Sequence, residues 1–210
     1  MSALYRKDAT GAAPDQRLAP WPGPALGYPL TDWSRNGRFV LNTRGTVETQ
    51  SDIWVIPVTP DGHLAADVQP KPYLRTPVNE SAGRFSPEPN PRWIAYQSDE
   101  SGHDEVYIQS FPTPGTRYQV TTGGAVAHYW SPDGKRIICL TSDLRAAIAF
   151  DIQTEPEFHI GPPREFARLP GVEQGDFSRD LKHDFALLPV GGEHPRITMI
   201  QNWTAALRER

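Results

Sequence analysis

The feature that most constrains the fold of this chain is a short phrase that occurs four times along it. Each copy has an aromatic residue, then serine, then a polar turn that leads into an apolar run. The copies are Trp33-Ser34-Arg35-Asn36-Gly37-Arg38, Phe85-Ser86-Pro87, Trp130-Ser131-Pro132-Asp133-Gly134-Lys135 and Phe177-Ser178-Arg179-Asp180. Their aromatic residues, called the anchors below, lie 52, 45 and 47 residues apart. Such a period indicates that the chain is built from repeated units.

The length of the unit predicts the architecture. The second copy replaces a short turn with Glu88-Pro89-Asn90-Pro91, which adds about two residues, so the period is about 47 to 50 residues. This is the size of one four-stranded propeller blade. We therefore predict an all-β fold, a β-propeller of four-stranded antiparallel blades with about four and a half blades present, in a partial or open ring. The turns at residues 35–36, 88–91 and 179–181 are expected to differ in geometry without changing the number of strands.

The repeats divide the chain into units. A half blade is expected at residues 1–20, full blades at 28–76, 81–121 and 126–168, an incomplete last blade at 172–203 and a tail at 204–210. Gly37 and Gly134 are expected to supply the positive φ that a tight hairpin requires. The four anchors, Trp33, Phe85, Trp130 and Phe177, are interpreted as wedges that fill the space between neighbouring blades.

The series begins with a half blade and ends with an incomplete one, so unpaired strand edges are expected at both ends. Such edges favour pairing with another chain. The chain then resembles a piece of a larger ring, and it would have no function alone if it were such a fragment. Two alternatives remain: residues 3–8 and 16–19 could complete the last blade and close a five-bladed ring, or two copies could close on each other.

Composition agrees with many short strands. The chain has 210 residues with 22 Pro, 17 Gly and 10% aromatic residues, so turns are frequent. The net charge is −4 and no cluster of basic residues occurs, which argues against nucleic-acid binding. Cys139 lies inside an apolar strand and is interpreted as a buried, inert thiol. No apolar run approaches the ~18 residues of a membrane span, and the N-terminus lacks the apolar core of a signal peptide, so direct membrane insertion is not expected.

The repeat resembles that of TolB-like propellers, a WD-repeat-like group. The residues that carry this resemblance are Trp130 to Lys135 and the run Tyr96-Gln97-Ser98-Asp99-Glu100-Ser101-Gly102-His103-Asp104-Glu105-Val106-Tyr107. A narrower resemblance, to the C-terminal propeller of bacterial membrane-anchored serine/threonine protein kinases, runs through Leu4-Tyr5-Arg6-Lys7-Asp8, Thr31-Asp32-Trp33-Ser34, Asp52-Ile53-Trp54-Val55, Asn79-Glu80-Ser81 and Asn202-Trp203-Thr204-Ala205. That resemblance implies a sensor or scaffold domain outside the cytoplasm, although this chain carries no export signal of its own.

Catalytic motifs are missing from the sequence. It has no glycine-rich phosphate loop, no His-Arg-Asp loop, no Asp-Phe-Gly and no Gly-x-Ser-x-Gly elbow, so kinase or peptidase activity would have to lie in another domain. Five of the six histidines are interpreted as solvated turn residues, and none has metal-ligand spacing. The acidic residues at 99, 100, 104 and 105 are interpreted as a polar hairpin, since the spacing of a calcium loop is missing. No metal and no cofactor are predicted.

A binding site, if one exists, is expected at the mouth of the central channel, where the innermost strands lie. The residues directly before the anchors, with His128 beside them, combine both charges with an aromatic ring. They are Asp32, Arg84, Tyr129 and Asp176. Equally, these groups could only satisfy one another.

The sequence therefore predicts a non-catalytic propeller binding or sensor module, the C-terminal part of a larger signalling protein that resembles a bacterial serine/threonine kinase. Its partner would be a protein or a small ligand at a propeller face, and open blade edges would permit self-association. The alternatives are the gating propeller of a prolyl-oligopeptidase-like or tricorn-like peptidase, or a TolB-like periplasmic scaffold.

Overall fold

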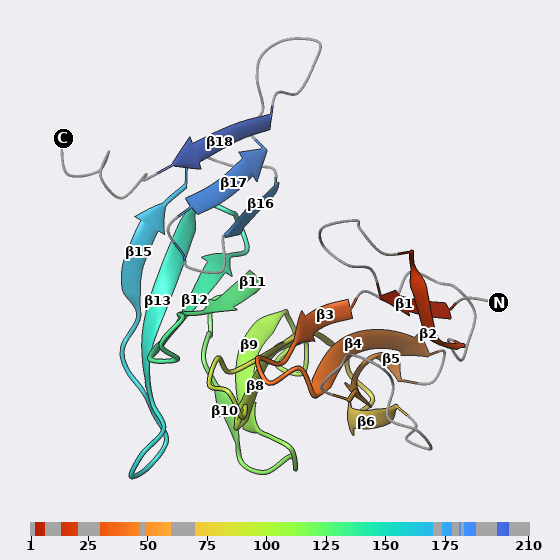
Figure 1. Cartoon of the computed structure of the whole chain (residues 1–210). Helices are drawn as coiled ribbons and strands as arrows, with labels where there is room; N and C mark the ends of the chain where they lie inside the picture. Colours follow the sequence, from red (N-terminus) through yellow and green to blue (C-terminus); the bar gives the residue numbers. More distant parts are fainter. Residues whose placement is uncertain are drawn as a thin grey trace.

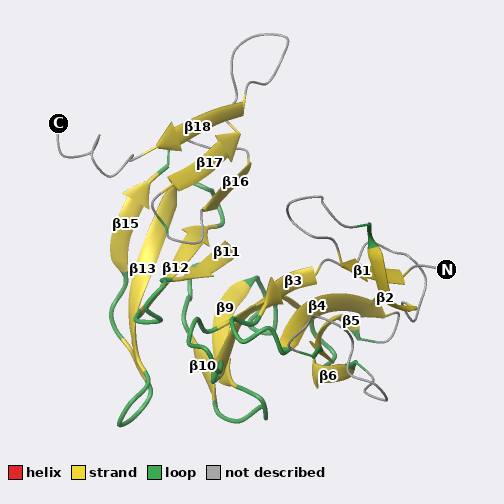
Figure 2. Cartoon of the chain, viewed as in Figure 1, coloured by secondary structure: helices red, strands yellow, loops and turns green. Residues whose placement is uncertain are grey.

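A computed structural model describes residues 3–6, 14–20, 30–46, 49–59, 70–169, 174–177, 181, 183–187 and 197–201. This part of the chain contains β-strands and no helix (Figure 2). The strands pair antiparallel within five separate sheets. Consequently, no helix of membrane-crossing length and apolarity occurs among the described residues.

The first two sheets contain the N-terminal strands. They are β1 (Ala3–Arg6) with β2 (Gln16–Pro20), and β3 (Leu30–Trp33), β4 (Phe39–Thr46), β5 (Gln50–Pro57) and β6 (Lys71–Leu74). The third sheet contains β7 (Glu80–Phe85), β8 (Trp93–Ser98), β9 (Glu105–Ser110) and β10 (Arg117–Gln119). The fourth contains β11 (Ala125–Trp130), β12 (Arg136–Thr141), β13 (Ala146–Gln153), β14 (His159–Ile160) and β15 (Arg164–Arg168), and the fifth β16 (Gln174–Phe177), β17 (His183–Leu187) and β18 (Ile197–Gln201).

The sheets are arranged one after another in an arc (Figure 1). The strands β3, β11 and β16 face the middle of the arc, and β6, β15 and β18 lie at its periphery. Each of the innermost strands β3, β7, β11 and β16 begins its sheet and pairs on one side only. Successive antiparallel sheets whose first strands face a common centre define a propeller segment, which confirms the predicted fold class.

The arc is open. The sheet of β1 and β2 and the sheet of β16 to β18 do not share a strand pairing among the described residues. In Figure 1 the two sheets lie at opposite ends of the arc. The alternative in which the N-terminal strands complete the last blade is therefore not the arrangement that these strands adopt.

The turn after the third anchor explains why the repeated phrase needs serine and aspartate. The hydroxyl of Ser131 donates to Oδ1 of Asp133 (2.6 Å) and accepts from the backbone N–H of Arg136 (2.9 Å). The same Asp133 oxygen accepts from the N–H of Lys135 (3.1 Å). Gly134 has φ 70°, a value at which a Cβ is strained. Ser34, Asn36 and Gly37 (φ 71°) repeat these contacts after the first anchor.

Two further turns use the same hydrogen bonds with other residues. After the second anchor, Oε1 of Glu88 takes the place of the aspartate and accepts from the hydroxyl of Ser86 (2.9 Å) and the N–H of Arg92 (3.0 Å). The longer side chain spans the two extra residues, so the insertion keeps the strand pairing. Thr141 and Asp143 form a fourth example between β12 and β13, where Leu144 (φ 54°) occupies the glycine position.

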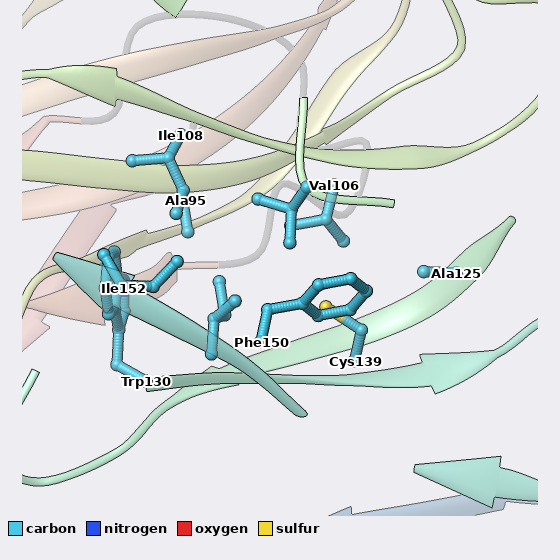
Figure 3. Close-up of a cluster of buried hydrophobic side chains, with 10 residues drawn as sticks. Ala95, Val106, Ile108, Ala125, Trp130, Cys139, Phe150 and Ile152 are labelled. Carbon is cyan, nitrogen blue, oxygen red and sulfur yellow. The ribbon is translucent and has the colours of Figure 1, made fainter. Parts of the chain in front are cut away.

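The interfaces between blades form the core. Trp130, at the end of β11, belongs to a buried cluster that includes Ala95, Val106 and Ile108 of the preceding sheet, and Figure 3 shows this cluster. Phe85 packs likewise in a cluster with Leu41 and Ile53. These two anchors are 8% and 5% exposed, whereas Trp33 is 48% exposed. The preceding sheets cover Phe85 and Trp130. No described residue covers Trp33 in this way, which is why it is more exposed.

The hairpin between β13 and β14 reaches back to the preceding blade. Phe158 lies against Trp93 and Tyr118, with ring centroids 4.5 Å and 4.0 Å away. Beside it, Glu155 accepts a 2.5 Å hydrogen bond from the guanidinium of Arg92. The sequence did not predict β14, because its two residues extend a blade that already has four strands.

Candidate functional site

The candidate site is built from the residues that precede the anchors, called the inner-strand set below. They are Asp32 on β3, Arg84 on β7, Tyr129 on β11 and Asp176 on β16. Each of these strands begins its sheet and pairs on one side only. Figure 1 shows β3, β11 and β16 facing the middle of the arc.

Asp32 links the first full blade to the second. Its Oδ2 accepts a 2.8 Å hydrogen bond from the backbone N–H of Phe85 on β7. Its Oδ1 accepts from the backbone N–H of Trp33 (2.8 Å). A carboxylate that accepts two backbone N–H groups is held in one orientation, so Asp32 has a structural role between the two inner strands.

Arg84 links the second blade to the third in a different way. Its guanidinium carbon lies 4.8 Å from the centre of the Tyr129 phenol ring, a cation–π distance. Its backbone carbonyl accepts a 3.3 Å hydrogen bond from Nε1 of Trp130. Both contacts reach β11, so the positions before successive anchors each bind the next blade.

The path of Arg84 follows from strand alternation. Trp130 faces the second blade, so its neighbour Tyr129 points to the opposite side of the sheet, where it packs with Ile138 and Leu140. Arg84 starts from the second blade and still reaches the Tyr129 ring. Arg84 therefore contacts β11 on the side of the sheet opposite to Trp130.

His128 lies behind the inner-strand set. It is 1% exposed and sits opposite Cys139 in the register of β11 and β12. Burial has the largest effect on the pKa of His128 and, together with the charge of Arg84, lowers it to about 3. An interaction with the Ala95 backbone raises this pKa to a smaller extent. Neither ring nitrogen has a well-formed hydrogen bond within the described part of the chain. His128 is thus neutral at pH 7 and inaccessible, so it supports the inner strand and does not line its surface as the sequence suggested.

The remaining predicted residues are placed less fully. Tyr129 is 7% exposed. Asp176 pairs with Phe185 in the register of β16 and β17, and its side chain lies outside the described atoms, as does that of the anchor Phe177. The predicted tail at 204–210 also lies outside the described residues.

Sequence reasoning missed two buried carboxyl groups between the first and second full blades. Asp52 and Glu80 are 0% and 3% exposed. Asp52 accepts from the hydroxyl of Thr49 (2.7 Å), and Glu80 accepts from the hydroxyl of Thr76. Within the described residues, Oδ1 of Asp52 and Oε2 of Glu80 have no hydrogen-bond donor. Burial raises the pKa of both groups, and the charge of Asp52 adds to the rise at Glu80.

Glu105 is the equivalent of Asp52 one blade later, and it is fully satisfied. It is 0% exposed, and its carboxylate accepts from the hydroxyl of Thr121 and the N–H of Gly124 (2.9 Å) and pairs with Nε2 of His103 (2.7 Å). The extra methylene of glutamate lets it reach these donors.

The neighbours of Glu105 in the acidic hairpin have separate partners, since Asp99 binds Asn79 and Glu100 pairs with Arg117. In the described ranges, no three His, Cys, Asp or Glu residues come together as metal ligands would.

Comparison with known proteins supports the fold. No protein-family model matches the chain, and no curated protein matches it. TolB from Acinetobacter baumannii is similar in structure, with a TM-score of 0.66 and 14% identity over 96% of this chain and 47% of TolB. A protein from Agrobacterium tumefaciens described as TolB has a TM-score of 0.59 and 15% identity, over 80% of this chain and 57% of that one.

A third similar structure is a prolyl endopeptidase, with a TM-score of 0.54 and 12% identity over 96% of this chain and 29% of that one. At such identities the likeness defines the fold alone. The chain therefore has the fold of a β-propeller segment, similar in structure to part of TolB. It spans about half the length of the TolB proteins that it matches.

Proposed function

We propose that this chain is a non-catalytic binding module that recognises a ligand or a protein through the inner-strand set. The observation that carries the proposal is a series of contacts across three consecutive blades: Asp32 accepts from the N–H of Phe85, and the guanidinium of Arg84 lies over the Tyr129 ring. Rigid strands hold all three side chains, which is the arrangement that a preorganised binding surface needs.

We further propose that the module is the sensor part of a larger bacterial signalling protein. The support is the sequence resemblance to the propellers of membrane-anchored serine/threonine kinases, together with the fact that the chain spans about half of TolB. The chemistry of phosphotransfer would then belong to another domain, and the propeller would lie outside the cytoplasm. A reporter enzyme that is active only after export, fused to the propeller of the parent protein, tests the location. Reporter activity is expected, and its absence would contradict it.

The binding role is tested on the whole chain by NMR of the backbone amides during titration with a panel of amino acids, short peptides, sugars and organic acids. Shifts are expected at the inner ends of β3, β7 and β11. They should be lost in Tyr129→Phe or Arg84→Gln and kept in Arg164→Gln, an outer residue that pairs with Asp151. Shifts confined to β6, β10 and β15, or none with any probe, would overturn the proposal.

A second candidate is a propeller that gates a peptidase, and the similarity to a prolyl endopeptidase favours it. The two candidates differ in the domain to which the propeller is joined. A kinase domain and a membrane helix in the same coding sequence would support the sensor, and an adjoining hydrolase domain would support the gate.

A further inference from the structure

We propose that the inner-strand set binds a carboxylate, with the guanidinium of Arg84 as the group that contacts it. The inference rests on the proposed binding function and names the class of ligand. A carboxylate of a small organic acid and one on an acidic peptide share this chemistry.

The first support is that Arg84 has N–H donors to offer. A guanidinium has five N–H donors in a planar fork that fits a carboxylate with two hydrogen bonds. Several other arginines of the described ranges have a carboxylate partner, for example Arg92 with Glu155 and Arg164 with Asp151. Arg84 is half-buried, and among the described residues its guanidinium has the Tyr129 ring as neighbour and no carboxylate at ion-pair distance. A carboxylate ligand would supply that charged partner, and hydrogen bonds between two charged groups are stronger than those between neutral groups.

The second support is that the surroundings fix the guanidinium in place. Its carbon lies over the Tyr129 ring, 4.8 Å from the ring centre, and an arginine placed on an aromatic ring can still bind a carboxylate through its N–H groups. Asp32 is the acidic member of the set whose side chain is described, and it already accepts hydrogen bonds from the N–H groups of Phe85 and Trp33. An arginine whose rotamer is held before binding loses less conformational entropy when the ligand arrives.

The third support is the balance of charge, which favours a singly charged carboxylate over a phosphate dianion. The set contains one arginine and two aspartates by sequence, and His128 behind it is neutral at pH 7. One positive group can pair with one negative ligand group, while a second negative charge would be repelled by the aspartates.

The test titrates the whole chain with acetate, with neutral acetamide and with inorganic phosphate at constant ionic strength, and observes the Nε–H signal of Arg84 by NMR. Acetate should shift that signal, and phosphate and acetamide should act at least about tenfold more weakly, the loss expected for a missing charged hydrogen bond. Arg84→Gln should abolish acetate binding, Arg84→Lys should retain part of it, and the exposed Arg38→Gln should leave it unchanged. A short acidic peptide, compared with acetate, then distinguishes the two sources of the carboxylate.

The outcomes separate this inference from the function on which it rests. If acetamide or other neutral probes bind at β3, β7 and β11 while acetate does not, the site is real and its ligand class is wrong. If acetate binds equally well to Arg84→Gln, or shifts exposed arginines to the same extent, the carboxylate site is refuted. If no probe binds, the proposed function fails as well.

Discussion

The backbone N–H of Phe85 donates a 2.8 Å hydrogen bond to Oδ2 of Asp32, which lies 53 residues earlier in the chain. The bond joins the innermost strands of two neighbouring blades. It therefore connects two sheets that share no strand pairing, in addition to their side-chain packing and to hydrogen bonds such as that from the Tyr73 hydroxyl to the Ser110 carbonyl (2.6 Å).

Asp32→Ala should destabilise the chain by about 1 to 2 kcal/mol, because the Phe85 N–H loses its acceptor. Asp32→Asn should lose less, since the amide oxygen can still accept. Urea unfolding followed by tryptophan fluorescence measures both. The exposed Glu157→Ala, which has no such contact, is the matched control, and an equal effect of Glu157→Ala and Asp32→Ala would contradict the prediction.

Stability should fall as the pH drops from about 6.5 towards 3, because of His128. The pKa of His128 is lowered to about 3 in the folded chain and is ordinary in the unfolded chain, so the unfolded state binds a proton that the folded state does not. The slope from this group approaches about 1.4 kcal/mol per pH unit. Urea unfolding at pH 7, 6, 5 and 4.5 should give a flatter profile for His128→Leu. An unchanged slope in that variant would show that other groups cause the pH dependence.

Glu80→Gln should stabilise the chain at pH 7 by about 1 kcal/mol. Burial raises the pKa of Glu80, so its contribution to stability is greatest at low pH and is lost as the pH rises through the folded pKa. A neutral amide removes that loss and keeps an oxygen that can accept from Thr76. The matched variant Glu105→Gln should have the opposite sign, because its carboxylate is fully hydrogen-bonded. Thermal unfolding at pH 7 compares them, and two effects of the same sign would disagree with these contacts.

Two adjacent residues of β7 should respond in opposite directions. Ala82 has φ 53°, so Ala82→Gly relieves strain and should be neutral or stabilising by about 0.5 kcal/mol. A Cβ on Gly83 would lie 3.3 Å from Cδ1 of Leu41 and 3.4 Å from Cγ2 of Ile53. Both neighbours are 0% exposed and have little room to move, so Gly83→Ala should cost about 1 kcal/mol or more. The two residues lie where the register of β7 against β8 shifts, between Ser81 and Arg84. Equilibrium urea unfolding measures both variants, and a greater loss for Ala82→Gly than for Gly83→Ala would contradict this geometry.

The hairpin that joins the second and third blades should depend on packing more than on charge. Phe158→Ala should cost about 1 to 3 kcal/mol, because Trp93 and Tyr118 both lose a stacking partner. Glu155→Gln should cost less than about 0.5 kcal/mol, since its pair with Arg92 is mostly exposed to solvent. Urea unfolding in low and high salt measures both, and a larger loss for Glu155→Gln would reverse this ranking.

Local chemistry made the fold predictable. Ser131, Asp133 and Gly134 bind one another within five residues, so the turn can be recognised in the sequence wherever the same side chains recur. The substitution of Glu88 for the aspartate was also visible as an insertion. Leu144 was missed, because a leucine at positive φ is not a turn signal and only the hydrogen bonds of Thr141 and Asp143 reveal it.

The sequence by itself determined most of the strands and turns and the period of the blades. These depend on residues that are neighbours in the chain. The tertiary structure decided which polar groups are buried, among them His128, Asp52 and Glu80. It also decided that Arg84 of one blade lies over the Tyr129 ring of the next. Such contacts join residues of different blades, and their energies depend on burial and distance, which no local pattern contains.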